Sequence, residues 1–216
     1  MKKEYLHMNN YPPVDTDLLS AQPEIPGFEW FNPPAEWVIE KGSMIITSEP
    51  ETDFFRSPRG VQPKDNAHFL FYPVSGDFSV KTHLKADLKA FGDAGGLTIR
   101  LSAERWAKLC IERSPAGEIN IVSVVTDGYS DDANNELLTQ PEAFLRITRR
   151  GGLVGFHYSL DGKIWRFARN FRFPVPDGEA LLTGIHVQSP YSDGCSAGFR
   201  ELVFSKDTVE NFKSGE

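Results

Sequence analysis

The chain has 216 residues, a formal net charge of −7 and ordinary hydrophobic and charged fractions of 40% and 25%. Because a phosphate backbone is bound by surfaces rich in Lys and Arg, and no basic run offsets this charge, we expect no nucleic-acid partner. No apolar run reaches the roughly 18 residues of a membrane helix, so we expect no membrane association. No apolar run follows Lys2-Lys3 either, as a signal peptide would require, so we expect a cytoplasmic location.

Changes in composition divide the chain into an arm, a domain and a tail. Residues 1–27 are rich in proline and show no periodicity, which predicts an N-terminal arm, either laid on the domain or loose. Residues 28–205 form one predicted domain, because all-β domains commonly reach this length without a division. Residues 206–216 are a predicted C-terminal tail.

The first predicted elements of the domain are a hairpin, a long loop and a strand. Trp37–Glu40 and Met44–Thr47 are apolar runs that pair across a short turn containing Gly42. Residues 52–66 hold two prolines and a glycine and are interpreted as a loop. Residues 78–88 then alternate between core-type and polar side chains, which is typical of a strand with one buried face.

Further strands are predicted between turns rich in Gly, Pro, Asn or Asp. They are Leu97–Ser102, Trp106–Arg113, Ile119–Thr126, Phe144–Arg149, Leu153–Leu160, Lys163–Arg169, Leu181–Gln188 and Ala197–Phe204. Asp161-Gly162 supplies the positive φ that a tight hairpin turn needs. The helical turns considered are short, near Asn134–Leu138 and at the C-terminus. About a dozen short strands without a long helix predict an all-β, two-sheet antiparallel β-sandwich.

Strand periodicity also predicts which side chains leave the core. In a sandwich, alternate residues of each strand face outward. If the middle strands share one sheet, a single outer surface gathers Arg100, Trp106, Lys108, Glu112, Arg146, His157, His186 and Gln188. An exposed Trp beside charges and amides suits a sugar, whose apolar face stacks on the ring while polar groups hold its hydroxyls. The alternative is an ordinary solvated face, since outer faces of antiparallel sheets are usually polar.

Six short motifs occur in a fixed order. They are Thr52-Asp53-Phe54-Phe55, Val74-Ser75-Gly76-Asp77-Phe78, Asp93-Ala94-Gly95-Gly96-Leu97, Trp106-Ala107-Lys108 with Glu112, Ser123-Val124-Val125-Thr126, and Tyr158-Ser159-Leu160-Asp161-Gly162. This ordered set resembles the concanavalin A-like lectin/glucanase-fold family of unknown function that includes regulation-of-enolase-type proteins. The resemblance covers roughly residues 28–205 and implies a concanavalin A-like jelly roll with a concave outer face. The family has no settled activity.

Two positions depart from the family pattern. Ala94 stands where the family often has Gln, and Asp132 stands where it often has Trp. Both changes remove groups that could touch a ligand. We therefore expect the site to be altered in this chain.

Three classes of function follow. The leading hypothesis is a non-catalytic carbohydrate-binding domain, or regulation linked to carbohydrate metabolism, through the concave face. Its predicted ligand-binding residues are Trp106 as the stacking platform, Arg100, Lys108, Glu112, Arg146, His186 and Gln188 as polar contacts, and Asp53 and His68 at the rim. The second is a protein–protein regulator of a metabolic enzyme, as the family name implies. The third is a glycoside-active enzyme using Asp53, Glu112 or both.

The enzyme, metal and cofactor hypotheses have weaker patterns. Glycosidases of this wider fold use carboxylates at alternate positions of one strand, but the only such ladder, Glu49, Glu51 and Asp53, is interrupted by Pro50. Histidines are scattered singly, so we expect no transition-metal site. Residues 127–136 are rich in Asp and Asn but fit no dedicated calcium loop, and they are interpreted as a loop. No glycine pair has the context of a phosphate cradle, so we expect no cofactor.

Overall fold

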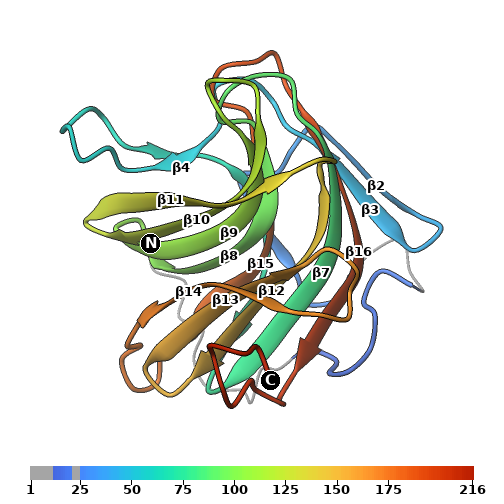
Figure 1. Ribbon diagram of the computed structural model, residues 1–216, viewed down its shortest axis with the longest axis vertical. Helices are drawn as coiled ribbons and strands as arrows, with labels where there is room; N and C mark the ends of the chain where they lie inside the picture. The colour runs from blue at the N-terminus through green and yellow to red at the C-terminus, as the bar shows by residue number, and fades with distance from the viewer. Residues whose placement is uncertain (1–11, 21–24) are drawn as a thin grey trace.

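Two seven-stranded antiparallel sheets pack face to face in the computed structural model, which describes residues 12–20 and 25–216 (Figure 1). The first sheet has the strand order β1-β6-β15-β8-β9-β10-β11, and the second has the order β14-β13-β12-β7-β16-β3-β2. The predicted all-β sandwich is therefore confirmed. Within the described ranges, no helix has the length and hydropathy needed to cross a lipid bilayer.

The bounds of the strands are as follows. The first sheet contains β1 (Glu29–Phe31), β6 (His68–Val74), β15 (Leu181–Gln188), β8 (Ala94–Ser102), β9 (Arg105–Arg113), β10 (Ile119–Asp127) and β11 (Tyr129–Leu138). The second contains β14 (Arg166–Arg172), β13 (Leu153–Ser159), β12 (Glu142–Arg150), β7 (Phe78–Asp87), β16 (Ser196–Ser205), β3 (Ser43–Thr47) and β2 (Glu36–Glu40). A separate ribbon pairs β4 (Phe54–Phe55) with β5 (Lys64–Asp65).

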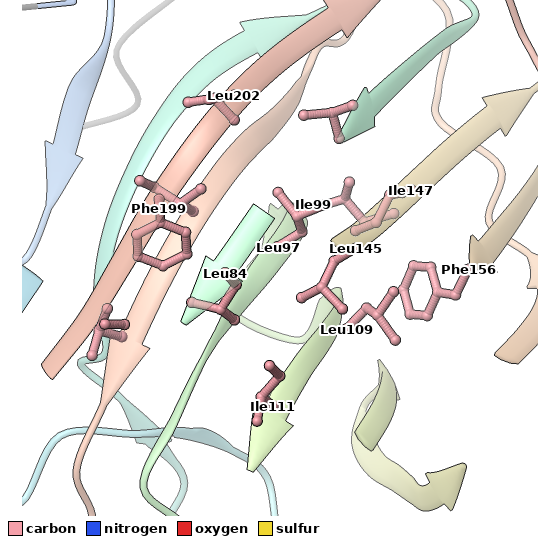
Figure 2. Close-up of a cluster of buried hydrophobic side chains, with 14 of the residues drawn as sticks. Leu84, Leu97, Ile99, Leu109, Ile111, Leu145, Ile147, Phe156, Phe199 and Leu202 are labelled. Carbon is pink, nitrogen blue, oxygen red and sulfur yellow. The ribbon is translucent and has the colours of Figure 1, made fainter. Parts of the chain in front are cut away.

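The main core lies between the two sheets, where alternate side chains of each strand interdigitate (Figure 2). Leu97 and Leu109 of the first sheet and Leu145 and Phe156 of the second are completely excluded from solvent. Burying each such side chain stabilises the fold by roughly 1.5–3 kcal/mol relative to leaving it exposed. The inward sides predicted for β8, β9, β12 and β15 are thus confirmed.

Several predicted elements are confirmed, while the strands β1, β4, β5, β6 and β11 were missed or misread. The β2–β3 hairpin forms across Lys41 and Gly42, both at positive φ (51° and 72°). Residues 127–136, interpreted as a loop with a helical turn near Asn134–Leu138, belong instead to β10 and the edge strand β11, which is paired with β10 along its length. An edge strand tolerates charged and amide side chains, so the polar composition of β11 did not identify it as a strand. β1 and β6 were not predicted, and β6 is mostly buried on both faces.

The Asp161-Gly162 hairpin is confirmed, but its turn is longer than predicted. β13 and β14 pair as antiparallel neighbours, and residues 160–165 lie between them, so β14 starts later than predicted. The Asp161 carboxylate accepts hydrogen bonds from the backbone N–H groups of Lys163 and Ile164, and Gly162 has φ +73°. These local bonds favour an open Asx-type turn over a two-residue one.

Both chain ends lie against the second sheet where they are described. Val14 bridges to Phe204 of β16, and Leu19 is buried in the main core. The rest of the predicted arm includes residues 1–11 and 21–24, which lie outside the described residues. At the other end, Phe212 packs on β13, where the C-terminal segment crosses the sheet (Figure 1).

Candidate functional site

The outer face of the first sheet is covered by residues 52–67, which we call the roof segment. Its Phe54 is fully buried and packs 5.8 Å from the Trp106 ring and 6.1 Å from the Phe69 ring, measured between centroids. A second apolar cluster forms between roof and sheet: Phe54, Ala67, Phe69, Phe71, Ala94, Trp106, Cys110, Val122 and Val124. The prediction of an exposed Trp106 is therefore wrong, because its relative exposure is 0%. Covering large apolar rings is favourable, and a segment interpreted from the sequence as a long loop supplies the cover.

Lys108 is held beneath the roof by oxygen atoms. Its Nζ donates hydrogen bonds to the Phe54 carbonyl (3.0 Å) and to Gln188 Oε1 (2.8 Å), and it lies 3.7 Å from Asp53 Oδ1. The residue is only 1% exposed. Gln188 in turn donates from Nε2 to the Gly92 carbonyl at 3.1 Å. A buried ammonium is tolerated only with such partners, so Lys108 ties the roof to the sheet.

A small pocket of about 110 Å³ opens beside this cluster. Its lining residues come from the roof, four strands of the first sheet, and two loops: Asp53, Phe55, Phe91, Gly92, Lys108, Glu112, Val124, Asp132, Gln188, Pro190 and Tyr191. Four predicted site residues, Asp53, Lys108, Glu112 and Gln188, are thus brought together. We call this the roof pocket.

Two carboxyl groups of the roof pocket, those of Asp53 and Glu112, have perturbed pKa values. Burial raises the pKa of Glu112 to about 7; the Lys108 ammonium opposes this shift, while Asp53 and Asp132 add to it. Burial also raises the pKa of Asp53, against the opposing pull of Lys108. Asp53 Oδ1 is fully buried and accepts no hydrogen bond from the described residues. Perturbed carboxyls in a cleft mark a candidate site, although structural clusters perturb pKa values too.

Two exposed aromatic rings stand at the mouth of the roof pocket. Phe91 and Tyr191 are 44% and 71% exposed, and their rings stack with centroids 5.3 Å apart and planes 11° apart. Neither was predicted, because both lie in loops where strand periodicity carries no information. Exposed aromatics beside polar groups are the signal that could have drawn attention to them.

Buried Asp93 fixes the two loops that carry these rings. Its carboxylate accepts hydrogen bonds from the backbone N–H of Lys89 (2.8 Å) and from the hydroxyls of Ser189 (2.8 Å) and Ser192 (2.9 Å). Ser189 also bridges to Thr52 at the start of the roof segment. One carboxylate therefore positions both sides of the pocket mouth.

Arg100, His186 and Trp106 lie on the predicted face but do not line the pocket. Arg100 makes a two-pronged ion pair with Asp65 of the roof (2.6 and 2.7 Å), and its guanidinium stacks on Phe31. His186 is buried against Thr98, and burial holds its pKa well below the ordinary value. Arg100 therefore anchors the roof segment to the sheet, Trp106 packs beneath Phe54 of the roof, and His186 joins two strands of the sheet.

Arg146 and His157 were placed on the same surface, and this grouping is wrong. Both belong to the second sheet, on β12 and β13. Arg146 lies 4.1 Å over the Trp165 ring and donates to the Gly215 carbonyl, while His157 is hydrogen-bonded to the Phe212 carbonyl oxygen. Alternation identifies the outward side of each strand but not which sheet the strand joins.

His68 does not face the pocket either. It neighbours Phe69, whose ring lies under the roof, and alternation turns His68 to the opposite side of β6. Its Nε2 accepts a hydrogen bond from the Glu49 backbone N–H, and its Nδ1 contacts the Asn32 carbonyl at 2.8 Å. The role of His68 in the structure is to pin the chain ahead of the roof segment.

The two departures from the family pattern both lie at the roof pocket. Asp132 lines it, and Ala94 pairs in register with Glu112 on one side and Gln188 on the other. The carboxylate ladder, by contrast, does not form: the Glu49 carboxylate accepts a hydrogen bond from the Ala35 backbone N–H at 2.6 Å, and Asp53 faces Lys108. Among the described residues, no group of three or more His, Cys, Asp or Glu side chains is placed to hold a metal ion.

Comparisons with known proteins agree with this architecture. A family model described as "Protein of unknown function (DUF1349)" matches residues 30–207. A protein of Saccharomyces cerevisiae (strain ATCC 204508 / S288c), named "Regulation of enolase protein 1", is 27% identical over 183 residues, which are 84% of this chain and 91% of that protein.

Solved structures show the same fold. The crystal structure of a functionally unknown protein from Saccharomyces cerevisiae matches with a TM-score of 0.77 and 25% identity, over 83% of this chain and 96% of that one. A Bacteroides ovatus structure, described as "Xyloglucan PUL GH43B", matches with a TM-score of 0.68 and 16% identity, over 88% of this chain and 38% of that one. These matches confirm the resemblance predicted from the ordered motifs and the concanavalin-like sandwich.

Proposed function

The chain belongs to the DUF1349 family of proteins of unknown function, and we propose that it is a non-catalytic carbohydrate-binding domain whose ligand docks at the roof pocket. One observation carries the proposal: a polar cluster of the buried Lys108 and Gln188 and the partly buried Asp53 and Glu112 opens to solvent directly beside the exposed, stacked rings of Phe91 and Tyr191. We further propose that binding takes place in the cytoplasm.

The chemistry of these groups suits a sugar. Hydroxyl groups donate hydrogen bonds to carboxylates, and the apolar face of a pyranose stacks on an aromatic ring. A buried ammonium and two partly buried carboxyls cost stability wherever they lack hydrogen bonds, as the buried Asp53 Oδ1 does here. Retaining them is readily explained if a ligand completes their hydrogen bonds.

The size of the pocket supports binding over catalysis. At about 110 Å³ it is smaller than the roughly 300–1,000 Å³ of typical small-molecule sites, so it accepts one edge of a sugar and leaves the rest on the rim. A glycosidase needs two carboxyl groups on either side of a scissile bond. Here Asp53 lies 3.7 Å from the Lys108 ammonium, which occupies it in a structural ion pair.

Sugar-induced stabilisation tests the proposal directly. Thermal unfolding of the wild type is measured against a panel of mono- and oligosaccharides, together with Tyr191→Ala. A ligand at about 100 times its dissociation constant adds roughly 2.7 kcal/mol, or about 5–10 °C for a chain of this size. We expect the shift to disappear in Tyr191→Ala, because the 71% exposed ring contributes contact to the ligand and little to the fold.

Tyr129→Ala is the matched control, since Tyr129 is 61% exposed and does not line the roof pocket. It should keep the wild-type shift. No shift with any sugar at millimolar concentration, or an equal shift in Tyr191→Ala, would contradict the proposal.

A second candidate is a protein–protein regulator, which the name of the yeast relative suggests. The observation that favours it is an apolar ridge on the β2–β3 hairpin: Trp37, Val38 and Ile45 are 39%, 46% and 37% exposed, and Val38 pairs in register with Ile45. Direct binding to purified enolase, measured with the wild type and with Val38→Lys, tests it. Tight binding that the substitution abolishes would favour this candidate over the sugar-binding one.

A further inference from the structure

We propose that the roof pocket selects hydroxylated ligands that carry a positive charge, of the amino-sugar or aminoalkyl-glycoside class, and rejects sugars that carry a phosphate or a carboxylate. This inference rests on the proposed function. It concerns the charge of the ligand, which nothing in the family description or the relatives addresses.

The hydrogen-bond donors of the pocket are already used within the protein. The Lys108 ammonium donates hydrogen bonds to the Phe54 carbonyl and Gln188 Oε1, and its charge is paired with Asp53 Oδ1 at 3.7 Å. The Gln188 amide donates to the Gly92 carbonyl. An anionic ligand would therefore find no free charged donor among these two groups.

The groups that remain available are acceptors. Asp53, Glu112 and Asp132 supply three carboxyls to the pocket lining against the single ammonium of Lys108. Asp53 Oδ1 lies 3.7 Å from the Lys108 ammonium and makes no hydrogen bond, Asp132 accepts none from the described residues, and the Glu112 carboxyl receives a weak bond from the Cys110 thiol at 3.8 Å. An ammonium group supplies both the missing protons and the missing charge.

The pocket mouth favours the same kind of ligand. The faces of aromatic rings attract cations, and Phe91 and Tyr191 are exposed at the edge of the acidic pocket. The two loops are held by Asp93, so the rings are positioned before a ligand arrives. The attraction of the rings for a cation adds to that of the carboxylates.

Three glycosides of matched size separate charge from sugar identity. The probes are 2-aminoethyl (cationic), 2-hydroxyethyl (neutral) and carboxymethyl (anionic) β-glycosides, each made with glucose and with xylose. Calorimetric titration at pH 7.5 and low salt should give an affinity for the cationic probe about tenfold or more above that of the neutral one, since partly buried charges interact strongly. The anionic probe should bind at least about tenfold more weakly than the neutral one.

Two substitutions on β11 locate the effect. Asp132→Asn removes one pocket charge, and Asp131→Asn removes the same charge from the neighbouring residue, which pairs with Arg169. Both side chains are exposed, so both variants should fold. We expect Asp132→Asn to reduce the preference for the cationic probe by about threefold or more while Asp131→Asn leaves it unchanged.

The outcomes separate this inference from the function on which it rests. Equal affinity for all three probes, or a preference for the anionic one, overturns the charge selection but leaves the proposed sugar site standing. A cation preference that Asp132→Asn does not reduce also overturns it, because the charge would then lie elsewhere. No binding of any probe, together with no thermal shift across the sugar panel, overturns both.

Discussion

At the scale of single residues, the roof pocket combines groups that a purely structural site would avoid. Glu112 has its pKa raised to about 7, chiefly by burial, and Lys108 is 1% exposed within the same cluster. Buried ionisable groups of this kind generally lower stability unless each is fully paired. Proteins commonly retain such destabilising groups where binding requires them, which is the trade-off between stability and function.

Replacing Glu112 by Gln tests that trade-off through pH. The folded pKa lies above the ordinary value of 4.5, so the folded state holds the proton more tightly than the unfolded chain. Below about pH 4.5 both states are protonated and Glu112 costs nothing; as pH rises through 7 the penalty grows to its full size, on the order of 3 kcal/mol. Glu112→Gln should therefore be more stable than the wild type at pH 8 and about equal at pH 4.

Urea unfolding at pH 4, 6 and 8 measures this difference. A variant whose unfolding free energy follows the wild-type pH profile across the whole range would show that Glu112 is not the group responsible. In that case the ionised Glu112 side chain would not lower the unfolding free energy of the wild type at pH 8.

At the scale of elements, the C-terminal segment provides a test away from the pocket. Gly155 of β13 has no side chain, and the ring of Phe212 fills the space: a Cβ at position 155 would lie 2.3 Å from Phe212 Cδ1. Gly155→Ala should displace the ring and free residues 211–216, at a cost of about 1–2 kcal/mol. Hydrogen exchange of the Gly215 N–H, which donates to the Asn211 carbonyl, should accelerate.

Gly152→Ala is the control, because a Cβ at position 152 meets nothing within 4 Å. In Phe212→Ala, the further substitution Gly155→Ala should cost little, since the two residues share one contact. If Gly155→Ala destabilised the chain equally with and without Phe212, the contact would not be the cause.

Elements also show what the sequence can and cannot predict. Alternating side chains predicted β7, β8, β9 and β15 and their inward faces, because period-two burial is a local property of a strand. The same rule missed β11, whose edge position is compatible with polar residues on both faces. It also placed Arg146 beside Lys108, because sheet membership depends on long-range pairing that one strand does not encode.

The candidate site was predictable only in part, for a similar reason. Asp53, Lys108, Glu112 and Gln188 were identified from strand faces and motifs, and the structure brings them together. The burial of Trp106 depends on Phe54, from a segment with no periodicity to predict its docking. Loop residues such as Phe91 and Tyr191 are positioned by tertiary hydrogen bonds, which leave no local pattern.

At the scale of the whole molecule, the roof pocket is one of several hollows on the sandwich, and larger ones are lined by residues of the second sheet such as His83 and Arg146. The roof segment covers the middle of the first sheet, and the C-terminal segment lies against β12 and β13 of the second. The edges β11 and β14 are tied together by the ion pairs Arg169–Asp131 and Arg166–Glu136. The roof pocket is therefore built on a sandwich whose two sheets are linked at one edge and covered by segments on their outer faces.

The most direct test of the proposed function is to map sugar binding on the protein by NMR. Amide shifts of the ¹⁵N-labelled chain are followed while neutral oligosaccharides of glucose, xylose, galactose and mannose are added to millimolar concentration. We predict that the largest changes cluster at Asp53, Gly92, Glu112 and Tyr191, with those of β14 and the β2–β3 hairpin unchanged. Changes confined to the hairpin or the second sheet, or none with any sugar, would contradict a carbohydrate site at the roof pocket.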